Sequence, residues 1–259
     1  MKGIKQLLQT RFPAKAMLVT LCIWVLTTSY QQARAQRNEI GVAFGGAFYM
    51  GDLNPKLPLV MINPGGGVFY RLNFNQHWSV RGNVYYLRVE GNDAYIGYNP
   101  ERDLSFFSDI YEFSVQTEVN FLQYQAGNLN TPFTPYLFGG LGGFTFHPKR
   151  LMPGGAIVDL TNVNQRAEYG LHDKETDYGL VSYSLLFGVG FKFNITRFVS
   201  TGIEWGMRRT GTDYLDDLSY GNPPSFAGNP KNNDWYSFFG LILSFKINDP
   251  SRVPCPYPD

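Results

Sequence analysis

Between Tyr111 and Phe121 the chain alternates strictly between two kinds of side chain. The odd positions carry Tyr, Phe, Val, Thr, Val and Phe, and the even positions from Glu112 to Asn120 are polar. Successive side chains of a β-strand point to opposite faces of the sheet. The segment is therefore predicted to be a strand with one apolar and one polar face.

The same pattern recurs along most of the chain, and no helical pattern accompanies it to cover the apolar faces. It predicts eight strands, at residues 38–49, 65–73, 78–90, 111–121, 134–146, 182–193, 198–209 and 234–247. The fifth is Gly-rich, and its faces stay unassigned. A closed sheet with its apolar face towards lipid is the β-architecture that spans a bilayer. We therefore predict an all-β fold: an eight-stranded, antiparallel, up-and-down transmembrane β-barrel over residues 36–247, with a filled interior.

The connections between these strands differ in length. Those near 73–77 and 194–198 are short and that near 122–133 is intermediate, whereas those near 50–64, 91–108, 147–181 and 210–233 are long. Short turns on one side and long loops on the other are typical of outer-membrane barrels. With an even strand number, both ends of the barrel and the tail at residues 248–259 are expected in the periplasm.

The first 35 residues have the features of a cleaved export signal. A basic start precedes the mostly apolar Met17–Leu26, and Ala33–Ala35 offers a small-x-small cleavage site before Gln36. The apolar stretch is shorter than the ~20 residues of a comfortable transmembrane helix. The expected location is the outer membrane, as a multi-pass barrel. The alternative is an uncleaved N-terminal anchor.

Composition supports a membrane barrel and argues against a nucleic-acid partner. Aromatic residues make up 16% of the chain, and Tyr and Trp favour the headgroup level of membranes. The first 35 residues hold five basic residues and no acidic one, which leaves 17 basic and 21 acidic residues and a net charge of −4. Nucleic-acid binding would call for a basic patch.

Charged residues on the polar faces are expected to meet inside the barrel. Because an unpaired buried charge is costly, these residues are predicted to form a structural ion-pair network that fills the interior. The members are Arg71, Arg81, Glu112, Glu118, Lys192, Glu204, Arg208 and Lys246. The alternative is a gated or ion-conducting interior.

Little in the sequence points to catalysis, and no cofactor or metal is expected. There is no Gly-x-Ser-x-Gly motif and no His/Cys cluster with metal-ligand spacing. The Gly-rich run from Gly139 to Gly143 lacks the spacing of a nucleotide loop, and Gly on a barrel strand permits bending or close packing. An enzyme would need a rim cluster, and the candidates are His147 or His172 with Asp213, Asp216 or Asp217.

The tail from Asn248 to Asp259 contains four prolines and Cys255. Proline at this density favours an extended, semi-rigid segment. Cys255 is the single thiol left after removal of the signal, and an odd cysteine in an oxidising compartment suggests an intermolecular pairing or a free thiol. We interpret Cys255 either as an incidental residue or as a covalent tether to a periplasmic partner.

Two stretches resemble the PorG-like family of outer-membrane barrels. They are Asn38–Gly41 (NEIG) leading to Tyr49–Pro55 (YMGDLNP), and Pro135–Gly142 (PYLFGGLG). The Gly-Asp-Leu-Asn-Pro after the first strand contributes most to this resemblance. It implies a non-enzymatic component of the type IX protein secretion system, which in some bacteria also supports gliding motility. By this resemblance the barrel anchors or positions a periplasmic ring formed by a lipoprotein and its partner, and is not itself the pore.

Three rival hypotheses remain open. One is a general structural or adhesin-like barrel that acts through its extracellular loops. Another is an outer-membrane enzyme with a cluster at its rim. A third is a soluble ligand-binding barrel, in which the apolar faces would point inwards and the polar faces outwards.

Overall fold

The computed structural model describes residues 37–51, 61–92, 105–152, 155–162, 164, 179–215 and 233–247. They form nine strands: β1 (Arg37–Met50), β2 (Asn63–Asn73), β3 (Trp78–Asn92), β4 (Ser105–Asn120), β5 (Phe133–Leu151), β6 (Ile157–Asp159), β7 (Val181–Asn194), β8 (Val199–Thr210) and β9 (Trp235–Lys246). The predicted signal at 1–35, the tail at 248–259 and most of the long loops lie outside the described residues. In the described part, no helix is long and apolar enough to cross a membrane.

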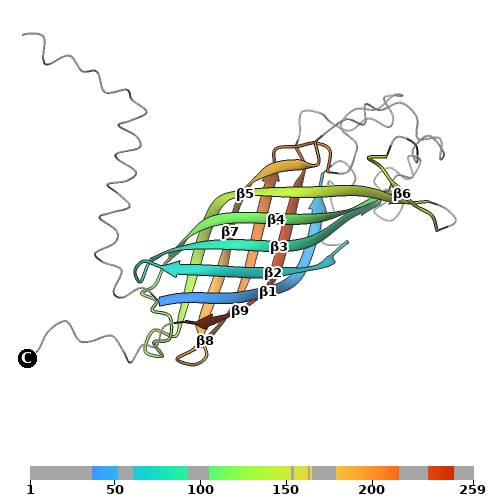
Figure 1. The fold of residues 1–259 in the computed structure, drawn as a ribbon. Coiled ribbons are helices and arrows are strands. Elements are labelled where there is room, and N and C mark those ends of the chain that lie inside the picture. The colour runs from blue at the N-terminus through green and yellow to red at the C-terminus, as the bar shows by residue number, and fades with distance from the viewer. Residues whose placement is uncertain are drawn as a thin grey trace, which may run out of the picture. The chain divides into compact units, whose positions relative to one another are not determined.

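Eight of the strands close into a barrel, which Figure 1 shows with its tilted strands. Each pairs antiparallel with the next along the chain, β5 pairs with β7, and β1 pairs with β9 to close the cylinder. The ninth strand, β6, adds three residues to the end of β5. The predicted all-β, eight-stranded, antiparallel up-and-down barrel is thus confirmed.

Two strands are longer than the alternation predicts. β4 begins at Ser105 rather than Tyr111, and β5 continues to Leu151 rather than residue 146, whereas the other bounds agree within two residues. On the N-terminal side of Tyr111 the polarity of the two faces of β4 reverses. There Phe106 and Ile110 are apolar residues that point inwards, while Asp109 points outwards. His147, which we expected in a long loop, consequently lies on β5, and that expectation was wrong.

The apolar faces point outwards and the charged faces inwards. On β4, Phe113 is 61% exposed whereas the adjacent Glu112 is 1% exposed. This arrangement is the reverse of a soluble ligand-binding barrel. The exposed apolar residues form a band around the barrel, the apolar girdle: Ile40, Val42, Phe44, Val68, Val84, Phe113, Val115, Leu137, Leu141, Leu185, Phe187, Val189, Phe191, Ile203, Trp205, Phe239, Leu241 and Phe245.

The polarity of the wall reverses beyond the girdle, at the end of the barrel that carries the long loops. There the inward residues of β3, β4 and β5 are mostly apolar, although Ser108 is also buried. Leu87, Phe106 and Phe146 are examples, and they belong to the buried hydrophobic cluster. The outward residues include Arg88 and Lys149. On β3 and β4 the charged inward residues are therefore confined to the part nearer the short turns, and our assignment of polar faces to the interior does not hold at the far ends of these two strands.

Candidate functional site

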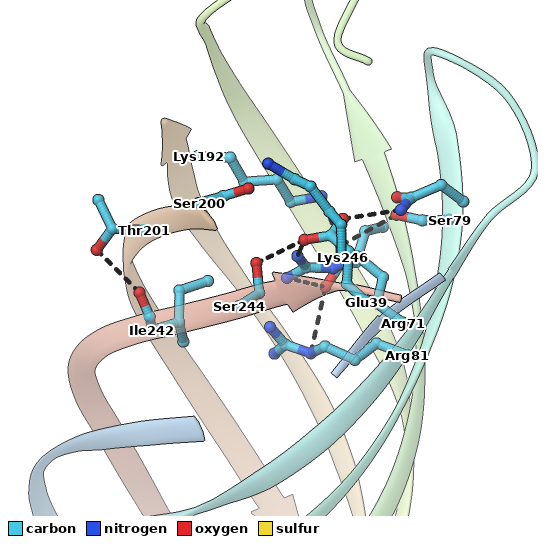
Figure 2. A network of polar contacts seen from close by, with 12 residues as sticks. Glu39, Arg71, Ser79, Arg81, Lys192, Ser200, Thr201, Ile242, Ser244 and Lys246 are labelled. Carbon is cyan, nitrogen blue, oxygen red and sulfur yellow. Dashed lines mark hydrogen bonds and ion pairs between the residues drawn. The ribbon is translucent and has the colours of Figure 1, made fainter. Parts of the chain in front are cut away.

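Glu118 on β4 lies at the centre of the polar half of the lumen. Its carboxylate is 2.9 Å from Arg71 Nε, 3.2 Å from Arg81 Nε and 2.6 Å from Lys192 Nζ. All four side chains are at most 1% exposed. Figure 2 shows the three cations converging from different strands. One carboxylate thus links β2, β3, β4 and β7 across the interior.

Glu39 on β1 supplies a second carboxylate to Arg71. The two side chains are 3.2 Å apart, and Glu39 also accepts hydrogen bonds from Ser244 and Asn73. We did not single out Glu39 from the sequence. Its inward position was nevertheless recoverable, since Glu39 lies one residue before Ile40 on the apolar face and so belongs to the polar face of the same strand.

Two further glutamates are held by arginine and tyrosine. Glu204 accepts from Arg81 Nη2 at 2.7 Å and from the Tyr136 hydroxyl at 2.6 Å. Glu112 accepts from Arg208 Nε at 3.2 Å and from the Tyr236 hydroxyl at 2.7 Å. These contacts satisfy the carboxylates that reach towards the middle of the barrel, as buried charge requires.

Aromatic rings fill the space between these charges. The guanidinium carbons of Arg71 and Arg81 each lie 5.0 Å from the ring centroid of Phe69, and Lys192 Nζ lies 4.3 Å from that of Tyr136. Such cation–π contacts gain strength where water is excluded. The lumen is therefore occupied by interlocked side chains, as expected for eight strands.

Asn194, at the end of β7, holds the turn of residues 121–132 against the mouth of the barrel. Its Nδ2 donates to the carbonyl oxygens of Gln125, Asn128 and Thr131 at 3.0–3.1 Å. Its Oδ1 accepts from the Tyr124 hydroxyl and from the backbone nitrogen of Gly127. We call this turn the short-turn cap. No sequence motif marked it, because its carbonyls come together only in the fold.

The short-turn cap is buried where it meets the lumen. Tyr124 and Ala126 are 2% and 3% exposed, and burial together with the negative charge of Glu39 raises the pKa of the Tyr124 phenol. Lys246 donates to Asn194 Oδ1 at 3.0 Å and so also contacts this cap. The remaining seven predicted interior residues all take part in the ion pairs described above.

Of the candidate enzyme residues, the described part of the chain contains His147, on β5, and Asp213, which follows β8. His77 lies in the turn between β2 and β3, and His147 on β5 has Asp109 as its register partner. His172, Asp216, Asp217 and Cys255 lie outside the described residues. No group of three or more His, Cys, Asp or Glu within the described ranges could hold a metal ion.

Comparison with known families assigns the chain. The family described as "Domain of unknown function (DUF6089)" matches residues 15–256, which is nearly the whole chain. This protein belongs to the DUF6089 family. No curated protein sequence matches it.

Several solved barrels are similar in fold to this DUF6089 protein. The attachment invasion locus protein Ail of Yersinia pestis, in complex with the heparin analogue sucrose octasulfate, has a TM-score of 0.43 and 13% identity, and the match covers 82% of this chain and 99% of Ail. Neisserial surface protein A has a TM-score of 0.40 and 13% identity, covering 80% and 95%. OprG of Pseudomonas aeruginosa has a TM-score of 0.38 and 11% identity, covering 83% and 96%. Similarity this distant carries no argument about function.

Proposed function

We propose that this DUF6089 protein is a non-enzymatic, non-conducting barrel of the outer membrane that serves the type IX secretion system, where it anchors or positions a periplasmic ring. The observation that supports a non-conducting membrane barrel is the lumen filled by the ion pairs around Glu118, inside a barrel with an apolar girdle. A barrel of this kind offers no passage, so the periplasmic ring would meet one of its two ends.

The apolar girdle supports the membrane location. Exposed Phe, Leu and Val side chains around a closed barrel would be costly in water, whereas in a bilayer they meet acyl chains. Tyr86 and Tyr111, with ring centroids 5.3 Å apart, lie at one border of the girdle, and Trp78 lies at the other. Aromatic residues favour these two levels of a membrane.

The non-conducting role follows from the contacts in the lumen. Three cations surround Glu118, and the short-turn cap covers the mouth through Asn194. An ion entering this interior would have to separate buried ion pairs, at a cost of several kcal/mol for each pair. The pairing favours a structural interior over the gated one.

The type IX role rests on the resemblance to the PorG-like family. Asn38–Gly41 and Tyr49–Met50 belong to β1, and Pro135–Gly142 to β5. By this resemblance the partners are the ring lipoprotein and its ring partner, with outer-membrane lipids around the barrel. The ring would meet the short-turn end, with Cys255 on the tail as a covalent tether.

The decisive experiment is a gentle detergent extraction of native membranes followed by a pull-down on this chain. Co-purification of a lipoprotein with a second periplasmic protein supports the proposal. Recovery of the barrel alone, together with unimpaired protein secretion in a deletion strain, refutes it.

The adhesin-like alternative is tested by a loop deletion. Residues 147–151 and 157–159 belong to β5 and β6, so the deletion should be confined to residues 163–178. A ring anchor lacking this segment still supports secretion, whereas an adhesin loses its binding activity.

A further inference from the structure

A cluster of charged side chains lies on the outer surface of the wall where β3, β4 and β5 leave the apolar girdle. Arg88 Nε is 2.7 Å from Asp109 Oδ1, and Lys149 Nζ is 3.9 Å from Asp109 Oδ2. The Tyr86 hydroxyl donates to the same Asp109 oxygen at 2.8 Å. We call Arg88, Asp109 and Lys149 the outer-wall triad.

The level of the triad on the wall is set by the strand register. Tyr86 pairs with Tyr111 at the border of the girdle, and the next outward pair on the same strands is Arg88 with Asp109. On the girdle side the outward residues are apolar, beginning with Val84 and Phe113. A cluster one step beyond an aromatic border lies at the depth of lipid headgroups.

The triad retains capacity to bind an anion. Arg88 and Lys149 both contact Asp109, and Asp159 on β6 is the register partner of Lys149. The side chains of Arg88 and Lys149 are nevertheless 41% and 34% exposed, against 16% for Asp109. Ion pairs this exposed contribute little to stability. Arg presents a planar fork that matches phosphate, and Lys adds a compact charge. In contrast, Arg71, Arg81, Lys192 and Arg208 in the lumen form ion pairs with buried carboxylates.

A groove of about 290 Å³ lies beside the triad, nearer the end of the wall. It is lined by Met61, Glu90, Asn92, Phe107, Leu151 and Ile157. Phe107 connects the two features, since the guanidinium carbon of Arg88 lies 5.4 Å from its ring centroid. An aromatic face beside amide and carboxylate groups offers a sugar ring both stacking and hydrogen bonds.

We propose that the outer-wall triad and the adjoining groove bind a phosphorylated glycolipid of the outer leaflet. The phosphate would lie between Arg88 and Lys149, the sugar in the groove above Phe107, and the acyl chains along the girdle below Tyr86 and Tyr111. This inference rests on the outer-membrane location of the proposed function and is independent of the ring partner.

The test uses the purified mature protein in detergent micelles, with native mass spectrometry to measure retained lipid. The probes are phosphorylated lipid A, the same lipid A without its phosphates, and inorganic phosphate. The wild-type barrel should prefer the phosphorylated form by about tenfold or more, because charged hydrogen bonds to phosphate are worth that much. Arg88→Gln combined with Lys149→Gln should abolish the preference for the phosphorylated form. Phe107→Ala should weaken the binding of both forms of lipid A.

The matched control is Arg209→Gln. Arg209 is an exposed cation on β8 whose guanidinium carbon lies 5.9 Å from the Trp235 ring centroid, so it resembles the triad in chemistry but not in place. The control should keep the full preference, and heat-modifiable migration on SDS gels verifies that each variant is folded. The proposal is overturned if the double variant retains the preference or if inorganic phosphate alone displaces the lipid. A ring pull-down that fails leaves this result standing, so the two proposals are separable.

Discussion

Lys192 Nζ lies 2.6 Å from Glu118 Oε2, although 74 residues separate the two and their strands, β7 and β4, are not neighbours. The pair therefore reaches over β5, which lies between these two strands, rather than bridging adjacent strands. Arg71 on β2 binds the same carboxylate, so Glu118 joins its own strand to two strands with which β4 shares no backbone hydrogen bonds.

Replacing Glu118 by Gln should destabilise the barrel strongly. The change leaves three buried cations without their shared carboxylate, and removal of one partner from a buried pair costs about 3–5 kcal/mol. Urea unfolding of the refolded protein in lipid vesicles, followed by Trp fluorescence, measures the loss. Glu90→Gln, on the outer wall, is the control and should change the free energy of unfolding by less than about 0.5 kcal/mol. Equal effects of the two changes would contradict the role of Glu118.

Replacing Asn194 by Ala should loosen the short-turn cap. Its amide donates to three carbonyl oxygens of the 121–132 turn, and each lost hydrogen bond costs about 1 kcal/mol. Hydrogen exchange of the amides between Tyr124 and Thr131 should accelerate at least tenfold. Asn75→Ala breaks side-chain bonds within the β2–β3 turn only and should leave the exchange of the cap unchanged. A cap that stays protected in the Asn194 variant would show that this residue does not hold it.

The alternation of the sequence predicts only part of the structure of the interior. Alternation assigned the strands and seven of the residues that form ion pairs, because side-chain direction along a strand has a period of two. It could not assign partners such as Lys192 with Glu118, since these depend on strand tilt and on the stagger of the closed barrel. Nor could it find Asn194, whose partners are backbone carbonyls of a turn without a sequence signature.

The apolar end of the interior was missed for a related reason. On the N-terminal side of Tyr111, β4 has the pattern of a soluble sheet, with the apolar Ile110 inside and the charged Asp109 outside. We assumed one patterning for each strand, whereas β4 and β5 carry both. The point at which the inward residues change from polar to apolar marks the level at which these strands leave the apolar girdle.

The glycines of β5 should differ sharply in their tolerance of Ala. A Cβ at Gly140 would overlap the carbonyl oxygen of Val115 and the backbone of Gln116, whereas a Cβ at Gly143 would meet nothing within 4 Å. Overpacking typically costs about 1–3 kcal/mol. Gly140→Ala should lower the free energy of unfolding in vesicles by this amount, and Gly143→Ala should leave it nearly unchanged. Similar stabilities of the two variants would refute the close approach at Gly140.

The proposed tether predicts a disulfide-linked adduct. Non-reducing gels of native membranes should show a band of higher mass that contains this chain and disappears on reduction. Cys255→Ser should abolish the band while leaving the barrel folded. If native membranes contain no such adduct, Cys255 is not a tether, and the membrane barrel is unaffected.

The central claim, that the outer face of the barrel contacts acyl chains and the inner face is sealed, is tested most directly by a spin-label scan of β4. Single labels would be placed at Phe113, Val115, Ser114 and Gln116 in the Cys255→Ser background, in lipid vesicles. Labels at Phe113 and Val115 should collide with dissolved oxygen but not with a water-soluble nickel complex, and those at Ser114 and Gln116 should be shielded from both. Access of the nickel complex to Phe113 and Val115 would contradict the account.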